Sequence, residues 1–133
     1  MDGNPSVRVP VEPDERVLRA WPVEPALPDG SADRGGWLVL TTHRVLFYRK
    51  PGLFGSGRGP APALFVRRLE EIGTLTSGRY WMKIGYGDRT EIPGVTIDGQ
   101  GFRLNRETPS QSVLAAIETA RQSRRSALGP RSP

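Results

Sequence analysis

The chain of 133 residues contains no cysteine. Disulfide bonds, thiolate metal sites and cysteine nucleophiles are therefore excluded, and side-chain packing must stabilise the fold. There is one histidine, His43, so a zinc site would have to be built from carboxylates, and the spacing of the acidic residues suggests none. We expect no metal and no cofactor.

Long hydrophobic runs are also missing. No segment approaches the ~20 apolar residues that a membrane-spanning helix needs, and the first residues lack the basic and apolar regions of a signal peptide. We expect a cytoplasmic protein, with peripheral contact at the inner membrane surface as a further option.

Glycine and proline, by contrast, are abundant. The chain has 16 Gly and 13 Pro, more than a helical bundle would tolerate inside its helices. The length allows one hydrophobic core. We expect a mainly β fold, a β-sandwich or partly open barrel of about seven strands, closed by one C-terminal helix.

Short apolar segments rich in β-branched and aromatic residues mark the strands. The clearest are residues 37–41 and 45–48, which predict a hairpin. Asp98 and Gly99 are a turn signal for the last hairpin. The other expected strands are residues 15–23, 63–67, 74–76, 80–84, 90–92, 95–97 and 101–104.

The last element is expected to be a helix that begins near Thr108. Thr108 is a good N-cap, Pro109 suits the first helical position, and Gln111 completes a capping box. The residues expected to pack on the sheet are Val113, Leu114, Ile117 and Ala120, and those expected to face outward are Glu118, Thr119 and Arg121.

Both ends of the chain are expected to be flexible. Residues 1–13 are polar and rich in proline, which interrupts hydrogen-bond ladders. The domain should therefore span residues 14–122. Residues 123–133 are expected to form a flexible basic tail.

The expected order of short strands and one helix resembles that of pleckstrin-homology-like (PH-like) domains. Residues 36–48, Gly-Trp-Leu-Val-Leu-Thr-Thr-His-Arg-Val-Leu-Phe-Tyr, are similar to a hairpin of GRAM and bacterial PH-like domains. Residues 52–55, 69–72 and 101–104 follow in that family's order, so the similarity covers residues 14–122. It implies a PH-like fold that binds lipid headgroups or peptides, without implying a single activity.

One loop departs from the lipid-binding members of that family. PH domains that bind phosphoinositides resemble one another in a Lys/Arg-rich loop between their first two strands. The corresponding residues 24–35 contain Glu24, Asp29 and Asp33 against Arg34 alone. This departure speaks against the usual headgroup site.

Three features that could indicate catalysis have simpler explanations. His43 lies between the two clearest strands, where an exposed turn residue is expected. Residues 52–59 nearly match a phosphate-binding loop, but an Arg and a Gly stand where a Lys and a Ser or Thr are needed. Glu70 and Glu71 are neighbours on an extended chain, so their side chains point to opposite faces. We expect no enzymatic activity.

Basic residues give the chain a formal net charge of +5, which favours acidic partners. The segment 50–62 places Leu53 and Phe54 between Lys50 and Arg58. A loop whose tip carries apolar side chains between basic ones can enter an anionic membrane surface or a groove of a partner protein. These four residues are the expected contact site. The next candidate is the groove between the helix and an open sheet edge, where an added peptide strand could pair.

We therefore expect a binding or adaptor module that recognises a protein, a peptide or an anionic membrane surface. The alternative is a small barrel that binds RNA or single-stranded DNA, because basic and aromatic side chains are supplied together by residues 47–50, 67–68 and 80–81. Against this alternative, four aromatic residues are spaced as core residues should be and are expected to be buried, namely Trp37, Phe47, Trp81 and Phe102.

Overall fold

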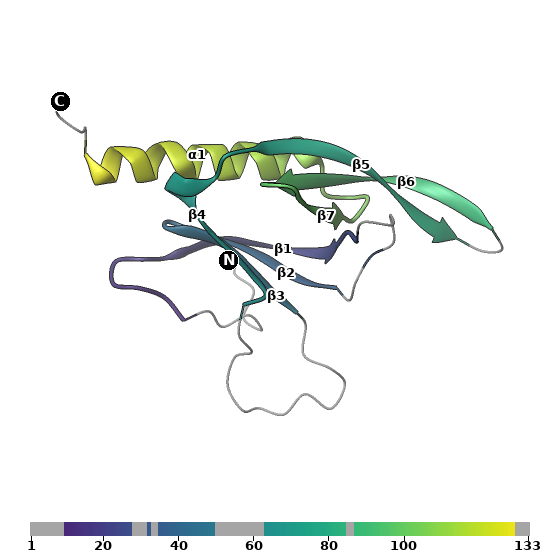
Figure 1. Ribbon diagram of the computed structural model, residues 1–133, viewed down its shortest axis with the longest axis horizontal. Coiled ribbons are helices and arrows are strands. Elements are labelled where there is room, and N and C mark those ends of the chain that lie inside the picture. Colours follow the sequence, from purple (N-terminus) through teal and green to yellow (C-terminus); the bar gives the residue numbers. More distant parts are fainter. Residues whose placement is uncertain (1–9, 28–31, 33–34, 50–62, 85–86, 130–133) are drawn as a thin grey trace.

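A computed structural model describes residues 10–27, 32, 35–49, 63–84 and 87–129. In this part of the chain, seven antiparallel strands curl into a half-barrel that one C-terminal helix caps (Figure 1). The expectation of a mainly β fold closed by one helix is confirmed. The elements are β1 (Val17–Pro25), β2 (Gly36–Thr41), β3 (Arg44–Arg49), β4 (Phe65–Arg68), the 3₁₀ helix η1 (Leu69–Glu71), β5 (Leu75–Ile84), β6 (Asp88–Ile97), β7 (Gln100–Leu104) and α1 (Ser110–Leu128).

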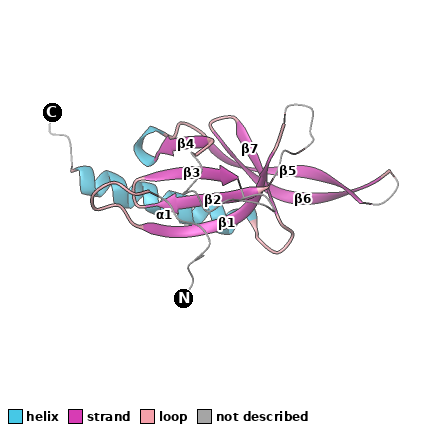
Figure 2. Cartoon of the chain, turned by 90° about the horizontal axis from the view of Figure 1, so that it is seen from below, coloured by secondary structure: helices cyan, strands magenta, loops and turns pink. Residues whose placement is uncertain are grey.

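The strands form one sheet in the order β4-β3-β2-β1-β7-β6-β5. Strand β1 joins the two halves, but it pairs with them to different extents. It pairs with β2 from Val17 to Val23, and with β7 only from Val23 to Pro25. Figure 2, in which the molecule is seen from below, shows β1, β2 and β3 side by side in front of α1, and the β5–β6 hairpin extending away from them.

Both expected hairpins are present. Strands β2 and β3 pair from Gly36 with Arg49 to Leu40 with Val45. Strands β6 and β7 are joined at Asp98 and Gly99, whose φ angles of 50° and 88° are those that Asp and Gly tolerate in a two-residue turn.

The hydrophobic core lies between the curled sheet and α1. The ring of Phe102 on β7 packs 5.7 Å from that of Phe47 and 5.3 Å from that of Phe65, measured between centroids. Three of the four helix residues expected to pack inward are buried, and Leu114 is partly buried against them. Fully buried core residues include Leu38, Leu40, Val45, Leu69, Val95, Ile97, Leu104, Val113 and Ile117.

Two side chains lie opposite to expectation. Trp81 was expected in the core, but its residue surface is 52% exposed; it lies on β5, in the hairpin that extends away from the other described elements (Figure 1). Arg121 was expected to face outward, but only 14% of its side chain is exposed. Its guanidinium pairs with Glu118 at 3.0 Å and donates to the carbonyl of Ile72 at 3.1 Å, so the charge is neutralised at the helix surface.

The start of α1 also differs from expectation. The N-cap is Pro109, which makes no side-chain capping bond, so there is no capping box. The hydroxyl of Thr108 instead donates to Oδ1 of Asn105, which also accepts the backbone N–H of Glu107. The helix ends at Leu128, so the expected domain boundary at residue 122 lies inside it.

The ends of the chain are described only in part. Residues 1–9 and 130–133, which belong to the two expected flexible segments, lie outside the described residues. Residues 10–13 contact the sheet through Glu12, which binds His43 and Arg68. Within the described residues, neither helix combines the length and the hydrophobicity that crossing a bilayer requires.

Candidate functional site

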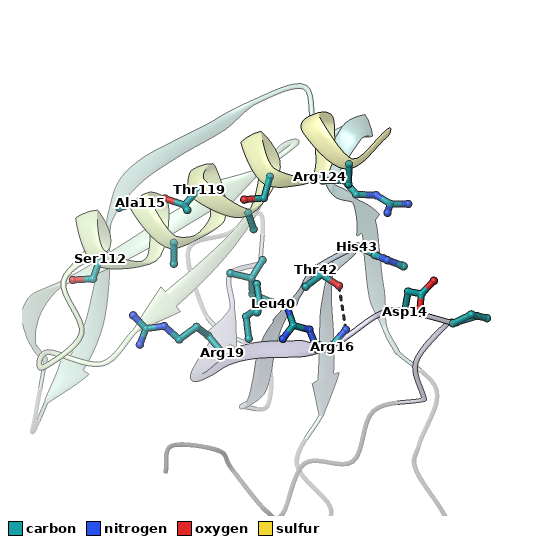
Figure 3. Close-up of a pocket in the computed structure, with 16 residues that line it drawn as sticks. Asp14, Arg16, Arg19, Leu40, Thr42, His43, Ser112, Ala115, Thr119 and Arg124 are labelled. Carbon is teal, nitrogen blue, oxygen red and sulfur yellow. Dashed lines mark hydrogen bonds between the residues drawn. The ribbon is translucent and has the colours of Figure 1, made fainter. Parts of the chain in front are cut away.

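A groove of about 1090 Å³ lies between β1 and α1, and we call it the β1–α1 groove. Figure 3 shows α1 as one wall and β1 as the facing wall, with Leu40 of β2 between them. Thr42 and His43, from the turn between β2 and β3, lie at one end. The groove therefore brings together segments that are far apart in the sequence.

Small side chains form the helix wall. They follow the i, i+3, i+4, i+7, i+11 spacing that places side chains on one face of a helix, and they are Ser112, Ala115, Ala116, Thr119 and Ser123. The adjacent stripe of α1 contains Val113 and Ile117, both fully buried. Large side chains thus hold α1 on the sheet, and the small ones beside them leave the groove open.

The facing wall carries two arginines, Arg16 just before β1 and Arg19 within it, and both are exposed. Between them the pairing of β1 with β2 is irregular, with a register shift between Val17 and Arg19. A β-bulge redirects the side chains around it, and Leu18 and Arg19 both line the groove. Among the described residues, the guanidinium groups of Arg16 and Arg19 have no hydrogen-bond or ion-pair partner.

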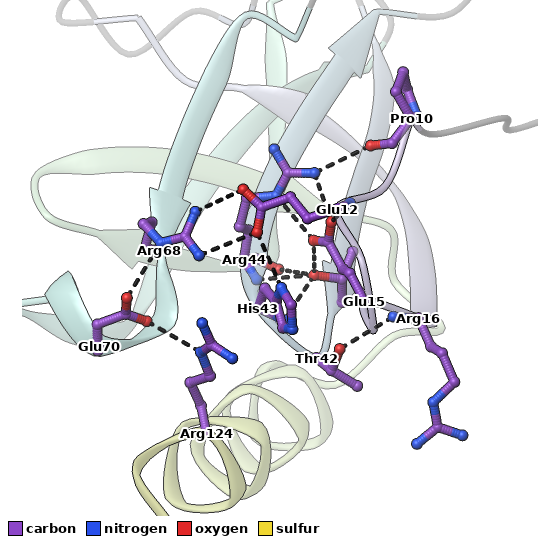
Figure 4. Close-up of polar contacts among 11 residues, drawn as sticks. Pro10, Glu12, Glu15, Arg16, Thr42, His43, Arg44, Arg68, Glu70 and Arg124 are labelled. Carbon is purple, nitrogen blue, oxygen red and sulfur yellow. Dashed lines mark hydrogen bonds and ion pairs between the residues drawn. The ribbon is translucent and has the colours of Figure 1, made fainter. Parts of the chain in front are cut away.

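A network of charged residues closes the end of the groove at the β2–β3 turn (Figure 4). Its centre is Glu15, whose side chain is completely buried. Arg44 donates to both carboxylate oxygens, from Nε at 2.9 Å and from Nη2 at 2.8 Å, and Thr41 Oγ1 donates at 2.5 Å. The buried charge is therefore neutralised and its oxygens are hydrogen-bonded, as a charge in the interior requires.

Thr41 also shapes the turn. Its Oγ1 accepts the backbone N–H groups of His43 at 2.9 Å and Arg44 at 2.8 Å. His43 is only 8% exposed, and its Nδ1 lies 3.0 Å from Oε1 of Glu12. The expectation of an exposed turn histidine is wrong, because the segment that carries Glu12 packs over this turn.

The same network reaches the helix. Arg68 donates two hydrogen bonds to Glu12, at 2.9 and 3.1 Å, and one to Glu70 at 3.1 Å. Nε of Arg124 lies 3.5 Å from the other carboxylate oxygen of Glu70. The segment before β1, the end of β4 and the C-terminal half of α1 are thereby connected, which fixes the position of α1 at this end of the groove.

Three potential metal ligands also meet in this network. Carboxylate oxygens of Glu12 and Glu15 and a ring nitrogen of His43 lie within 4.8 Å of one another. Glu12, however, accepts two hydrogen bonds from Arg68, and Glu15 accepts two from Arg44. A cation could bind there only if both guanidinium groups moved away, so the arrangement fits an ion-pair network better than a metal site.

The ion pairs lower the pKa values of both glutamates. Hydrogen bonds from Arg68 and His43 lower the pKa of Glu12 from 4.5 to about 2. Burial opposes ionisation of Glu15, but hydrogen bonds from Arg44 and Thr41 outweigh it, and the pKa of Glu15 also falls to about 2. Both side chains are therefore carboxylates at neutral pH.

We expect the free energy of unfolding to fall in acid. Glu12 and Glu15 have lower pKa values in the folded chain than in the unfolded chain, so the unfolded chain binds more protons as the pH decreases. Their contribution is complete above about pH 4.5 and is lost as the pH falls towards 2. Urea unfolding at a series of pH values between about 6 and 2.5 measures this loss. Glu15→Gln should make the dependence shallower, and a constant free energy over that range would contradict the ion-pair account.

The four residues that the sequence singled out as a contact site cannot be compared with the structure. Lys50, Leu53, Phe54 and Arg58 all lie outside the described residues. They remain a prediction.

The basic and aromatic residues considered for nucleic-acid binding do not form one exposed surface in the described part of the chain. Phe47 is buried in the core. Arg67 stacks 5.0 Å from the ring centre of Phe65 and pairs with Asp98 at 3.1 Å, and Arg68 is held by the ion pairs described above. Of the aromatic residues considered, Trp81 is the exposed one, and it lies on the β5–β6 hairpin. Stacking of several bases on these side chains is therefore not supported.

Sequence reasoning placed a second candidate site between the helix and a sheet edge, but it did not identify the residues. Arg16 and Arg19 lie within the expected strand 15–23, and local sequence patterns assign them no role. A signal was present in α1, where Ser112, Ala115, Thr119 and Ser123 form a small-residue face beside the apolar stripe. The partner of that face depends on how α1 crosses the sheet, which the spacing alone does not determine.

Comparison with known proteins adds little. The sequence matches no protein-family model and no curated protein. Among solved structures, the hSac2 domain from human phosphoinositide phosphatase Sac2 aligns with 92% of this chain and 78% of that chain, at 17% sequence identity and a TM-score of 0.42. A likeness at this level says nothing about what this chain binds.

Proposed function

We propose that this chain is a non-enzymatic PH-like binding module that recognises an acidic segment of a partner protein in the β1–α1 groove. The observation that carries the proposal is the pair of exposed arginines, Arg16 and Arg19, which lack partners among the described residues and line a groove with a small-residue helix wall. Such cations attract carboxylates and set the preference for acidic partners.

The shape of the groove favours an extended peptide over a single lipid headgroup. From Ser112 to Ala127 the helix wall is about 22 Å long, at 1.5 Å per residue. Arg19 lies below the Ser112 end of this wall, and Arg16 lies nearer to its opposite end (Figure 3). A compact phosphate group would require cations that converge on one point, whereas an extended acidic segment can meet separated ones.

Two observations support a role without catalysis. His43 is held by Glu12, and Glu12 and Glu15 are held by arginines, so these groups could act as a general base only if the network broke. The order β4-β3-β2-β1-β7-β6-β5 followed by one helix supports the PH-like assignment, a class of fold that serves many binding functions.

Fluorescence anisotropy with labelled probes separates the ligand classes. The probes are a heptapeptide pool built from Asp, Glu, Val and Thr, a matched pool with Lys and Arg in place of the acids, and a single-stranded oligonucleotide. Unlabelled vesicles containing phosphatidylserine serve as competitors. We expect the acidic pool to bind, with salt weakening the binding, and the basic pool not to bind. Absence of binding by the acidic pool would refute the proposal. Tighter binding of the oligonucleotide would indicate a nucleic-acid-binding module instead. Strong competition by the vesicles would indicate a module that binds anionic membranes.

A further inference from the structure

We propose that the acidic segment binds as an added β-strand along residues 17–22 of β1, with its backbone paired to β1 and its outer side facing α1. This inference rests on the proposed function, because it specifies how the same groove holds its peptide. It is carried by the unequal pairing of β1, by the dimensions of the groove and by the placement of charge.

The first step concerns hydrogen bonding. Strand β1 pairs with β2 over residues 17–23, but β7 covers its other edge only over residues 23–25. Among the described strands, residues 17–22 therefore have a neighbour on one edge alone. In a sheet, backbone N–H and C=O groups point alternately to the two sides, so about half of those in this segment have no partner in the strands that the structure describes.

The second step concerns space. Residues 17–22 are about 20 Å long at about 3.3 Å per residue, which matches the length of the small-residue wall of α1. Neighbouring strands need about 4.8 Å, and the groove of about 1090 Å³ is open beside Leu18 and Arg19, at the start of this segment. Because Ala115, Ala116 and Thr119 project little from α1, a peptide of six or so residues fits between the helix and β1.

The third step concerns charge and register. Arg16 and Arg19 lie at the start of the unpaired segment, on either side of the irregularity at Leu18. Side chains of an added strand alternate in direction, so acidic residues two apart would face the same side. Pro22 provides no N–H and so limits pairing at the far end of the segment. The expected ligand is thus an extended segment with acids at alternate positions near one end.

A bulge, a proline and charged side chains also protect sheet edges from aggregation. The two explanations differ in one measurable respect. Strand addition requires backbone hydrogen bonds from the peptide, whereas edge protection requires none.

A backbone N-methyl scan tests the inference directly. The tightest single peptide from the acidic pool is resynthesised with one N-methyl group at each position in turn, which removes an N–H and leaves every charge in place. Strand addition predicts that methylation at alternate positions weakens binding tenfold or more, while the positions between them change it about threefold or less. Hydrogen exchange, measured on the full chain, should also slow at backbone amides within residues 17–22 when the unmodified peptide is bound.

The outcomes separate the inference from the function on which it rests. If no peptide of the acidic pool binds, both fail. If the peptide binds but the N-methyl scan shows no alternation and the amides of residues 17–22 exchange as before, strand addition is wrong and the binding module stands. An alternating effect of N-methylation together with slowed amide exchange in residues 17–22 supports both strand addition and the proposed function.

Discussion

Glu15→Ala is expected to lower the free energy of unfolding by about 3 kcal/mol, because it leaves a buried guanidinium without its counter-ion. Arg44 loses two hydrogen bonds at 2.8 and 2.9 Å, and only 16% of its side chain is exposed. Thr41 Oγ1 also loses its nearer acceptor, at 2.5 Å, and keeps only the carbonyl of Arg44 at 3.3 Å. For a chain whose total stability is on the order of 5 to 15 kcal/mol, the melting temperature should fall by roughly 10 °C.

An exposed ion pair provides the matched control. Glu91 pairs with Arg79 at 3.4 Å on the β5–β6 hairpin, where 84% of the Arg79 side chain is exposed. Glu91→Ala should change the free energy of unfolding by less than about 1 kcal/mol, as is usual for surface pairs. Chemical denaturation of both variants at neutral pH gives the comparison. Equal effects would mean that Glu15 is not the centre of the network.

The expected strands at residues 74–76 and 80–84 are one strand, and the reason was not visible in the local sequence. Ser77-Gly78-Arg79 interrupts the apolar pattern, yet β5 pairs with β6 throughout, including Gly78 with Gly94. The ring of Tyr80 lies over Gly78, Gly94 and Gly101, so close that a methyl group at Gly94 or Gly101 would overlap it. Covering glycines with an aromatic ring restores packing that glycine lacks. Glycines that signal turns by composition here serve a continuous sheet.

The presence of a proline inside β6 is also explained by how the strands pair. Pro93 lies inside a strand where the sequence predicted a break between residues 90–92 and 95–97. Pairing of β6 with β7 extends only from Gly94 to Ile97, whereas pairing with β5 continues through Pro93. A proline is tolerated where one edge of its strand has no partner. Such an edge depends on the length of β7, which local sequence patterns do not reveal.

Strand type, both hairpins and the buried stripe of α1 were predictable, because each depends on residues close together in the sequence. The environments of His43 and Trp81 were not. His43 is buried by Glu12, 31 residues away in the sequence, and Trp81 is exposed because its hairpin extends beyond the elements that could cover it. The candidate site was not predictable either, because its two walls, β1 and α1, are separated by about 100 residues of sequence.

Reversing the charge of the groove should abolish most of the binding. In the double variant Arg16→Glu and Arg19→Glu, attraction for an acidic peptide becomes repulsion, and we expect the Kd to rise at least tenfold, which corresponds to about 1.4 kcal/mol. Both side chains are exposed and have no partner among the described residues, so the melting temperature should change little. The matched control is Arg79→Glu with Arg89→Glu on the β5–β6 hairpin, which changes the net charge equally at another exposed place.

The measurement that tests the central claim most directly is the Kd of the acidic heptapeptide for the parent and these two double variants, by anisotropy at low and high salt. Binding in the β1–α1 groove predicts a tenfold or greater loss for the variant at Arg16 and Arg19, a change of about threefold or less for the control, and a smaller difference between them at high salt. Equal losses in the two double variants would contradict it, because the peptide would then be responding to the net charge of the chain and not to the groove.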